Sequence, residues 1–219
     1  MPELPEVETI KNDLEKKIPG KTVQEVEIRK ERMVKGVSPR ELEGSLAGLR
    51  IEGLSRKGKI IIVEFSQGRY LLIHLKMTGQ LIYKDEQGMI AGGHSPEEEK
   101  DIMEAIGGEP PNKYTHVIFS FRDGSFLFFN DLRQFGYVKL TDQEGVKEVE
   151  REQGMDPLAE EFNPQDLRRA IKHRKIAIKQ LLMDQKVISG IGNIYADEIL
   201  FEAGIRPDRS SADIRETEV

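Results

Sequence analysis

The 219-residue sequence contains no cysteine. Disulfide bonds, thiol catalysis and thiolate-bound metals are therefore excluded for these residues. The sequence also has no apolar run long enough to cross a bilayer, and its N-terminus lacks the basic start and apolar stretch of a signal peptide. Together these absences favour a reducing cytoplasm as the compartment and argue against a membrane partner.

Basic residues are fewer than acidic ones: the sequence has 33 lysines and arginines and 39 aspartates and glutamates, which gives a formal net charge of −6. This balance argues weakly against a nucleic-acid partner, but the charges are segregated along the chain. Acidic residues gather in 85–112, whereas the C-terminal half carries a basic group: Arg168, Arg169, Lys172, Arg174, Lys175, Lys179 and Lys186. That group is either a solvated helix surface or a surface for phosphates.

The N-terminal stretch MPELPEVE predicts the start of a helix. Pro5 suits a first helical turn, where a missing N–H costs no hydrogen bond. Glu6 favours the positive end of the helix dipole. Apolar residues then recur at helical spacing and form one face: Val7, Ile10, Leu14 and Ile18.

The same stretch also supports a catalytic interpretation. Removal of Met1, which is usual before a small residue such as proline, would leave Pro2 as a terminal secondary amine. The pKa of an α-amino group is about 7.7–8.0, so a fraction of it is nucleophilic near neutral pH. Its attack on a sugar aldehyde carbon gives an iminium, which is an electron sink for elimination. Glu3 and Glu6 would lie beside it as proton donors and acceptors, and the heptapeptide alone leaves both interpretations open.

Runs of β-forming residues separated by turn residues dominate the first 140 positions. A strand is expected over 21–30, with Val23 and Val26 on opposite faces, and Ser38 is expected to cap a following helix. Asp123-Gly124 is a strong hairpin signal. Further strands are expected at 50–55, 59–65, 70–75, 80–83, 115–121 and 125–129. Two antiparallel groups of this kind predict a β-sandwich.

The fold class predicted from these patterns is α+β. Acidic residues with Gly and Pro pairs indicate an inserted surface loop over 85–112, with a short helix over 96–106. From about Thr141 the pattern becomes helical, and a helix capped by Asn163 is expected over 163–173. A largely buried helix that includes Ile176 is expected over 175–185, and another helix over 194–203. The expected domains are a catalytic β-sandwich over 1–140 and a helical domain over 141–219.

Two stretches combine a candidate binding residue with an ordinary structural alternative. The turn Gly190-Ile191-Gly192-Asn193 offers backbone amides at a helix start, which is a natural anion site, but Asn193 would serve equally as an N-cap. His74 lies within an otherwise apolar strand and is either a functional group or a satisfied structural residue.

Two further stretches are equally ambiguous by themselves. Lys57 and Lys59 flank Gly58 and are either solubility residues or point charges for a phosphate. Arg133 and Phe135 lie in the hexapeptide DLRQFG. Either both side chains reach into a base stack, or Arg133 is an ordinary surface residue and Phe135 an ordinary core residue.

Taken in order, five stretches resemble the formamidopyrimidine-DNA glycosylase family. They are MPELPEV at the N-terminus, RKGK at 56–59, HLKM at 74–77, DLRQFG at 131–136, and LLMDQ…GIGNIY over 181–195. The resemblance covers nearly the whole chain. It implies an enzyme that removes oxidised purines, such as 8-oxoguanine and formamidopyrimidines, from duplex DNA and then cleaves the strand by β,δ-elimination. It also implies a β-sandwich followed by a helix–two-turns–helix domain, in a monomer that works on the bacterial nucleoid.

Carried over by position, the resemblance gives the N-terminal residues their roles. Pro2 is expected to be the nucleophile at the sugar C1′, Glu3 the general acid/base and Glu6 a supporting carboxylate. Lys59, rather than Lys57, matches the family's phosphate-binding lysine. Leu4 and the Arg133/Phe135 pair favour the purine-specific branch, because the sister group endonuclease VIII, which acts on oxidised pyrimidines, usually has glycine at the position of Leu4.

The DNA-binding residues follow in the same way. His74 is expected to hold a phosphate that flanks the lesion. Met77, Arg133 and Phe135 are expected to fill the gap left by the everted base, with Arg133 facing the orphaned cytosine. The expected contacts from the helical half are Lys179, Gly192, Asn193 and Tyr195, of which Asn193 would hold a flanking phosphate.

The sequence departs from the family in one respect that bears on activity. The family normally ends in a cysteine-ligated zinc finger, and without cysteine we expect no cofactor in this chain. We therefore expect a fragment or a shortened homologue. Three hypotheses remain open: the glycosylase and lyase, a non-catalytic or weakly active damaged-DNA-binding fragment, and a destabilised fragment without function.

Overall fold

The computed structural model describes residues 2–91, 107–172 and 174–218. The helix expected over 96–106 lies outside the described residues. No helix among the described residues is long and apolar enough to span a membrane.

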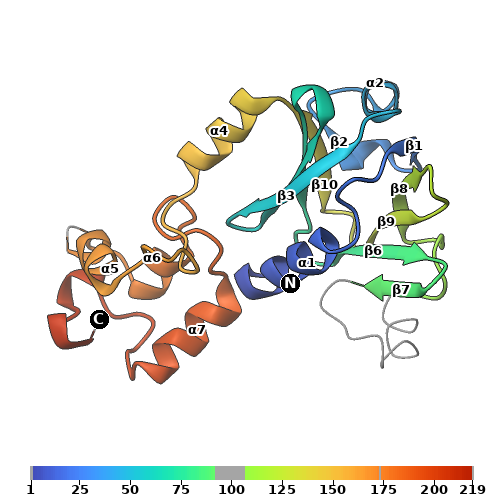
Figure 1. The fold of residues 1–219 in the computed structure, drawn as a ribbon. Helices are drawn as coiled ribbons and strands as arrows, with labels where there is room; N and C mark the ends of the chain where they lie inside the picture. The colour runs from blue at the N-terminus through green and yellow to red at the C-terminus, as the bar shows by residue number, and fades with distance from the viewer. Residues whose placement is uncertain (1, 92–106, 173, 219) are drawn as a thin grey trace. The chain divides into compact units, whose positions relative to one another are not determined.

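The chain divides into two compact units (Figure 1). The first comprises Met1–Arg56 and Ile60–Val146, and the second comprises Lys57–Lys59 and Lys147–Val219. Each unit has its own hydrophobic core.

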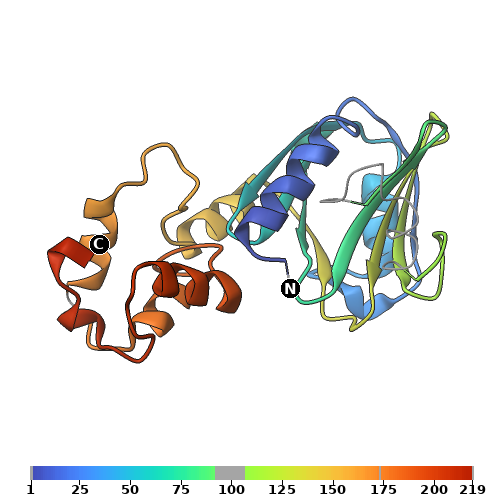
Figure 2. The same cartoon turned by 90° about the horizontal axis from the view of Figure 1, so that it is seen from below.

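The first unit is a sandwich of two five-stranded sheets, which appear as two layers in Figures 1 and 2. The first sheet has the order β1-β8-β9-β6-β7 and the second has the order β2-β10-β5-β4-β3. The first sheet consists of β1 (Val23–Ile28), β8 (Thr115–Phe121), β9 (Phe126–Asp131), β6 (Gly79–Asp85) and β7 (Gly88–Ala91). The second consists of β2 (Val34–Lys35), β10 (Tyr137–Thr141), β5 (Arg69–His74), β4 (Ile60–Phe65) and β3 (Ile51–Lys57).

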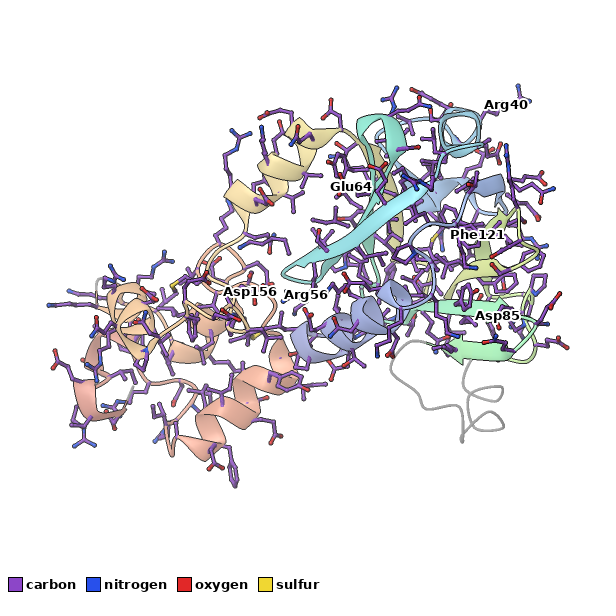
Figure 3. The ribbon with its side chains drawn as sticks, viewed as in Figure 1. Arg40, Arg56, Glu64, Asp85, Phe121 and Asp156 are labelled. Atoms are coloured by element: carbon purple, nitrogen blue, oxygen red, sulfur yellow. The ribbon has the colours of Figure 1, made fainter. Side chains whose placement is uncertain are left out.

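The expected β-sandwich is confirmed, with one parallel exception. β10 is the last strand in the chain, yet it lies inside its sheet, parallel to β2 and antiparallel to β5. Alternate strand residues face the core between the layers, among them Ile61, Val63 and the Phe121 labelled in Figure 3. Each such side chain stabilises the fold by roughly 1.5–3 kcal/mol relative to exposure.

Two helices pack on this sandwich, as the sequence predicts. α1 (Leu4–Glu15) buries Leu4, Val7, Ile10 and Leu14. α2 (Pro39–Leu46) begins after Ser38, whose hydroxyl accepts the Glu41 N–H at 3.2 Å and so caps the helix.

Three strand expectations were wrong or incomplete. Val23 and Val26 do not lie on opposite faces, because a register shift between Val23 and Glu25 turns both side chains into the core. β7 lies at the start of the stretch expected to be a loop, since Gly88 allows a tight hairpin back along β6. β10 precedes the helical region and was not anticipated.

The remaining helices begin with α4 (Gln143–Glu152), and the second unit contains α5 (Pro164–Ile171), α6 (Ile178–Met183) and α7 (Asn193–Glu202). Asn163 caps α5 by accepting the N–H groups of Gln165 and Asp166, as its place before Pro164 predicts. α6 is shorter than expected, and Ile176 precedes it with its side chain 38% exposed, so Ile176 is not part of a buried helix face.

Candidate functional site

The N-terminal end of α1 holds the residues expected to carry the chemistry. Glu3 is the N-cap and is fully buried, while Pro2 immediately before it is partly exposed. The Glu3 N–H donates to the Glu6 carboxylate at 2.9 Å, and the two residues form a capping box. This arrangement holds the Pro2–Glu3 segment in one orientation, next to two carboxylates at the positive end of a helix.

The body of α1 is fixed to the sandwich, so its N-terminal end has a defined position in the first unit. Leu4 is 4% exposed and Val7 is fully buried. Glu8 accepts a hydrogen bond from Arg56 Nε at 2.5 Å, and Figure 3 shows the Arg56 side chain reaching from β3 beside α1. Helix start and reactive amine are therefore compatible interpretations of one segment.

Lys59 and His74 lie at strand ends rather than within strands. Lys59 precedes β4 and is partly buried; it follows Gly58, whose φ of 55° favours glycine. His74 is the last residue of β5, and its Nδ1 accepts the Lys76 N–H at 3.1 Å. A neutral His74 with Nδ1 as acceptor carries its proton on Nε2, which is the donor that a phosphate contact needs.

Met77, Arg133 and Phe135 are exposed on loops of the first unit. Met77 is 40% exposed and Phe135 is 55% exposed, so the alternative of a core phenylalanine is wrong. The Arg133 guanidinium lies 4.9 Å from the centre of the Phe135 ring, a cation–π contact. An arginine stacked on an exposed aromatic ring suits contact with nucleobases better than it suits packing.

The glycine-rich turn of the second unit leads directly into α7. Gly190 has φ of 91°, a conformation that favours glycine. Gly192 is the N-cap, and Asn193 is the first helical residue and is exposed. The alternative that Asn193 is the N-cap is therefore wrong.

The Gln185 side chain clamps this turn. Its amide oxygen accepts the Gly190 N–H at 2.8 Å. Its amide nitrogen donates to the carbonyl oxygens of Met183, at 2.9 Å, and Ile191, at 2.7 Å. One side chain therefore fixes the path of the backbone into the helix N-terminus.

Lys179 and Tyr195 lie beside this turn in the second unit. Lys179 on α6 forms an ion pair of 2.7 Å with Asp197 on α7. Tyr195 is partly buried and packs against the core of this unit. Two arginines of the basic group are also paired with acids, Arg169 with Asp166 and Arg174 with Asp184, so the surface is less basic than its sequence suggests.

Sequence reasoning assigned no role to three residues that organise these loops: Thr78, Asp131 and Gln185. All three lie inside or beside the stretches that carry the family resemblance. Turn chemistry was the available signal, because Asp and Thr side chains commonly bond nearby backbone N–H groups and so define loops.

The residues of this chain do not fit a zinc site of the kind the family normally carries. There is no cysteine. Within the described ranges, no group of three or more His, Asp or Glu residues is placed to hold a metal ion. A thiolate-bound zinc therefore has no ligands here.

Comparison with protein families assigns both halves of the chain. Residues 1–138 match the family model "Formamidopyrimidine-DNA glycosylase N-terminal domain", and residues 153–219 match "Formamidopyrimidine-DNA glycosylase H2TH domain". Among curated proteins, a formamidopyrimidine-DNA glycosylase of Carboxydothermus hydrogenoformans is 40% identical over 218 residues, which is 100% of this chain and 72% of the relative. One from Pelotomaculum thermopropionicum is 36% identical over 222 residues, again 100% and 72%.

Solved structures give the same assignment. The Lactococcus lactis Fpg in complex with DNA that contains an abasic site is similar, with a TM-score of 0.82 and 30% identity, over 99% of this chain and 72% of that one. A mutant of the same protein bound to DNA containing Fapy-dG matches with the same score, identity and coverage.

Proposed function

This chain belongs to the formamidopyrimidine-DNA glycosylase family, whose members act on damaged DNA bases, and we propose that it excises oxidised purines from duplex DNA and then cleaves the strand by β,δ-elimination. The expected lesions are 8-oxoguanine and formamidopyrimidine. The observation that carries the proposal is the start of α1, where Pro2 precedes a buried Glu3 that the Glu6 carboxylate holds in place.

The reaction follows from a secondary amine at residue 2. With Met1 removed, the Pro2 nitrogen forms a bond to the sugar C1′ while the bond from C1′ to the base breaks, and the base leaves with a proton. Glu3 donates and accepts protons as the sugar ring opens, which leaves an iminium between Pro2 and C1′. The iminium accepts the electron pair released when a C2′ proton is lost, and the resulting enamine expels the 3′ phosphate from C3′ and restores a conjugated iminium. Loss of a second proton, from C4′, then supplies the electron pair that expels the 5′ phosphate from C5′. Water hydrolyses the final iminium and frees the Pro2 amine.

Pre-organisation of the carboxylates is the contribution of the fold. Glu6 bonds the Glu3 backbone, so it supports the acid/base residue rather than reacting itself. Leu4 is buried at the helix start, and the purine-specific branch is proposed from its identity as leucine rather than glycine.

DNA contacts are assigned to the loops and turns described above. Lys59, just before β4, and His74, at the end of β5, would each bind a backbone phosphate, and Asn193 with the Gly192 amide would bind phosphates at the α7 N-terminus. Lys179 and Tyr195 would support that surface. Met77, Arg133 and Phe135 would fill the space left by the flipped base, because a base must leave the stack before C1′ is accessible.

Borohydride trapping on a duplex with an abasic site tests the proposal. Protein with Met1 removed should form a covalent adduct, and protein that retains Met1 should not. Glu3→Gln should slow excision of 8-oxoguanine more than it slows trapping at a preformed abasic site. A Pro2→Gly variant is only a partial control, because its terminus is still an amine. No adduct with processed protein, or an equal adduct with Met1 retained, would exclude Pro2 chemistry.

A second candidate function is damaged-DNA binding without catalysis. The ion pairs that neutralise Lys179, Arg169 and Arg174 favour it, because fewer free cations remain for phosphates. Lesion-selective binding with neither trapping nor cleavage would identify this function. Both functions place a monomer on double-stranded DNA in the bacterial cytoplasm, and a cooperative thermal transition would separate either one from a destabilised fragment.

A further inference from the structure

Two loops of the first unit leave the sandwich from adjacent strand ends. The loop between β5 and β6 carries Met77, and the connection between β9 and β10 carries Arg133 and Phe135. β6 and β9 are paired, and their register places Gly79 opposite Asp131. The residues that start one loop and end the other are thus neighbours in the sheet.

Asp131 is buried, at 1% exposure, and both of its carboxylate oxygens are bonded to the loops. Oδ2 accepts the Gly136 N–H at 2.7 Å, which closes its own loop. Oδ1 accepts the Arg133 N–H at 3.1 Å and also the Thr78 hydroxyl from the other loop. The backbone carbonyl of Asp131 accepts a hydrogen bond from His116 Nε2 at 2.8 Å, which holds the residue in the sheet.

Thr78 completes the link between the loops. Its hydroxyl donates to Asp131 and accepts the Arg133 N–H at 3.0 Å. The hydroxyl of Thr78, the residue after Met77, therefore links the β5–β6 loop directly to the backbone of Arg133 in the other loop. A side-chain network that is satisfied in this way rigidifies what it joins.

Both loops also contain a residue with a left-handed backbone. Lys76 has φ of 54° and Gln134 has φ of 56°, and neither is glycine. Such conformations are uncommon for these residues and persist where surrounding bonds enforce them. Lys76 directly precedes Met77, and Gln134 lies between Arg133 and Phe135, so the enforced conformation sets the direction of all three exposed side chains.

We propose that Thr78 and Asp131 form a positioning pair that couples the two loops, so that Met77 and the Arg133–Phe135 pair enter the DNA as one unit. This inference rests on the proposed function, which gives those three side chains their task. It adds that recognition of the base opposite the lesion depends on a hydroxyl–carboxylate contact that does not itself touch DNA.

The test removes one hydroxyl without changing the shape of the side chain. Thr78→Val deletes both bonds made by the Thr78 oxygen, and Thr78→Ser retains them. Thr22→Val is the matched control, because Thr22 is also partly buried in the first unit but lies at a bridge with Arg50.

The first measurement needs no DNA. Hydrogen exchange of the free protein should show faster exchange, by about fivefold for a lost hydrogen bond, in both loops of Thr78→Val. Thr78→Ser and Thr22→Val should exchange in these loops as the wild type does. Faster exchange confined to 76–79, with 131–136 unchanged, would overturn the coupling.

The second measurement uses 8-oxoguanine duplexes with cytosine or adenine opposite the lesion. The quantity compared is kcat/KM with cytosine opposite the lesion divided by kcat/KM with adenine opposite it. Thr78→Val should reduce this ratio by about fivefold, and Thr78→Ser should keep it at the wild-type value. Arg133→Ala should remove the effect of Thr78→Val on that ratio, since Thr78 acts through Arg133. An unchanged ratio in Thr78→Val, or full additivity with Arg133→Ala, would overturn the positioning role.

Failure of the proposed function gives a different result. A wild-type protein that neither excises the lesion nor forms a borohydride adduct would refute the glycosylase, and with it the role in base recognition. The exchange measurement would still decide whether the two loops are coupled.

Discussion

Glu8 and Arg56 join α1 to β3 through an ion pair of 2.5 Å, in which the Arg56 side chain is only 6% exposed. Truncation of Arg56 would leave the Glu8 carboxylate without this partner and remove a buried side chain. We expect Arg56→Ala to lower the free energy of unfolding by about 2–3 kcal/mol, measured by denaturant titration. Glu15→Gln breaks the more exposed pair with Lys11 on the same helix and should cost about 0–0.5 kcal/mol. Equal losses in the two variants would contradict this assignment.

Gly79 is required by the tight turn that carries Met77. A Cβ at this position would lie 2.4 Å from the Leu75 carbonyl oxygen, which accepts the Gly79 N–H. Gly79→Ala is expected to destabilise the protein by about 2–3 kcal/mol in thermal or denaturant unfolding. Gly53→Ala is the control, because a Cβ at Gly53 meets no atom within 4 Å. A neutral Gly79→Ala would show that the turn relaxes freely.

The Lys21–Asp123 ion pair should make part of the stability depend on acid pH. Burial alone would raise the pKa of Asp123, but hydrogen bonds from Lys21 and Ser125 outweigh it and lower the pKa to about 2. A carboxyl whose pKa is lower in the folded state stabilises the fold above its unfolded value of about 3.9. This contribution should be lost as the pH falls from about 4 to 2.

Asp123→Asn should flatten that part of the stability profile, measured by denaturant unfolding at several pH values. The Asp123 side chain is 48% exposed, so solvent screening limits the expected loss at pH 7 to about 1 kcal/mol or less. An unchanged slope between pH 4 and 2 would show that Asp123 does not contribute to it.

Gln185 should control DNA binding without touching DNA. Gln185→Ala removes the three bonds that shape the turn before α7, so DNA affinity should fall by about tenfold. The dependence of log Kd on log salt should stay the same, because no phosphate contact of charged residues is deleted. Gln165→Ala, at an exposed position of α5, should leave affinity unchanged. A loss of salt dependence would instead indicate a direct role.

Asp197 should restrain DNA binding through its ion pair with Lys179. Asp197→Asn removes a negative charge and releases Lys179, so affinity should increase at low salt and the salt slope should steepen by about one. Glu198→Gln makes the same change of charge at the next residue of α7 and isolates the effect of the pair. An equal increase in DNA affinity in the two variants would show that the loss of one negative charge, rather than the release of Lys179, causes the effect.

Local signals predicted most of the elements. Ser38 and Asn163 cap helices as expected, and β8 spans the predicted 115–121. Features that depend on distant residues were not predicted. The register shift after Val23 arises in the pairing of β1 with β8, and the short strand β10 forms by pairing with both β2 and β5. Periodicity along one segment carries no information about either.

The candidate site shows the same division. Pro2, Glu3 and the turn at Gly190 are predicted as site residues because their chemistry or backbone is unusual for their position. The sequence predicts no role for Asp131 or Gln185, because each acts through hydrogen bonds to other parts of the chain. Asp131 bonds the Thr78 hydroxyl, and Gln185 bonds the Ile191 carbonyl. Single-residue chemistry is readable in a sequence, whereas hydrogen-bond partners are a property of the fold.

The place of β10 inside its sheet sets the order in which this protein can be assembled. β2 and β5 do not meet except through a strand that ends at Thr141. During synthesis, therefore, β5 presents an open edge to other chains until β10, which ends at Thr141, has left the ribosome. A ribosome that stalls before residue 137 would release a sandwich with an unpaired, strongly apolar strand, and such chains should be prone to edge-to-edge aggregation.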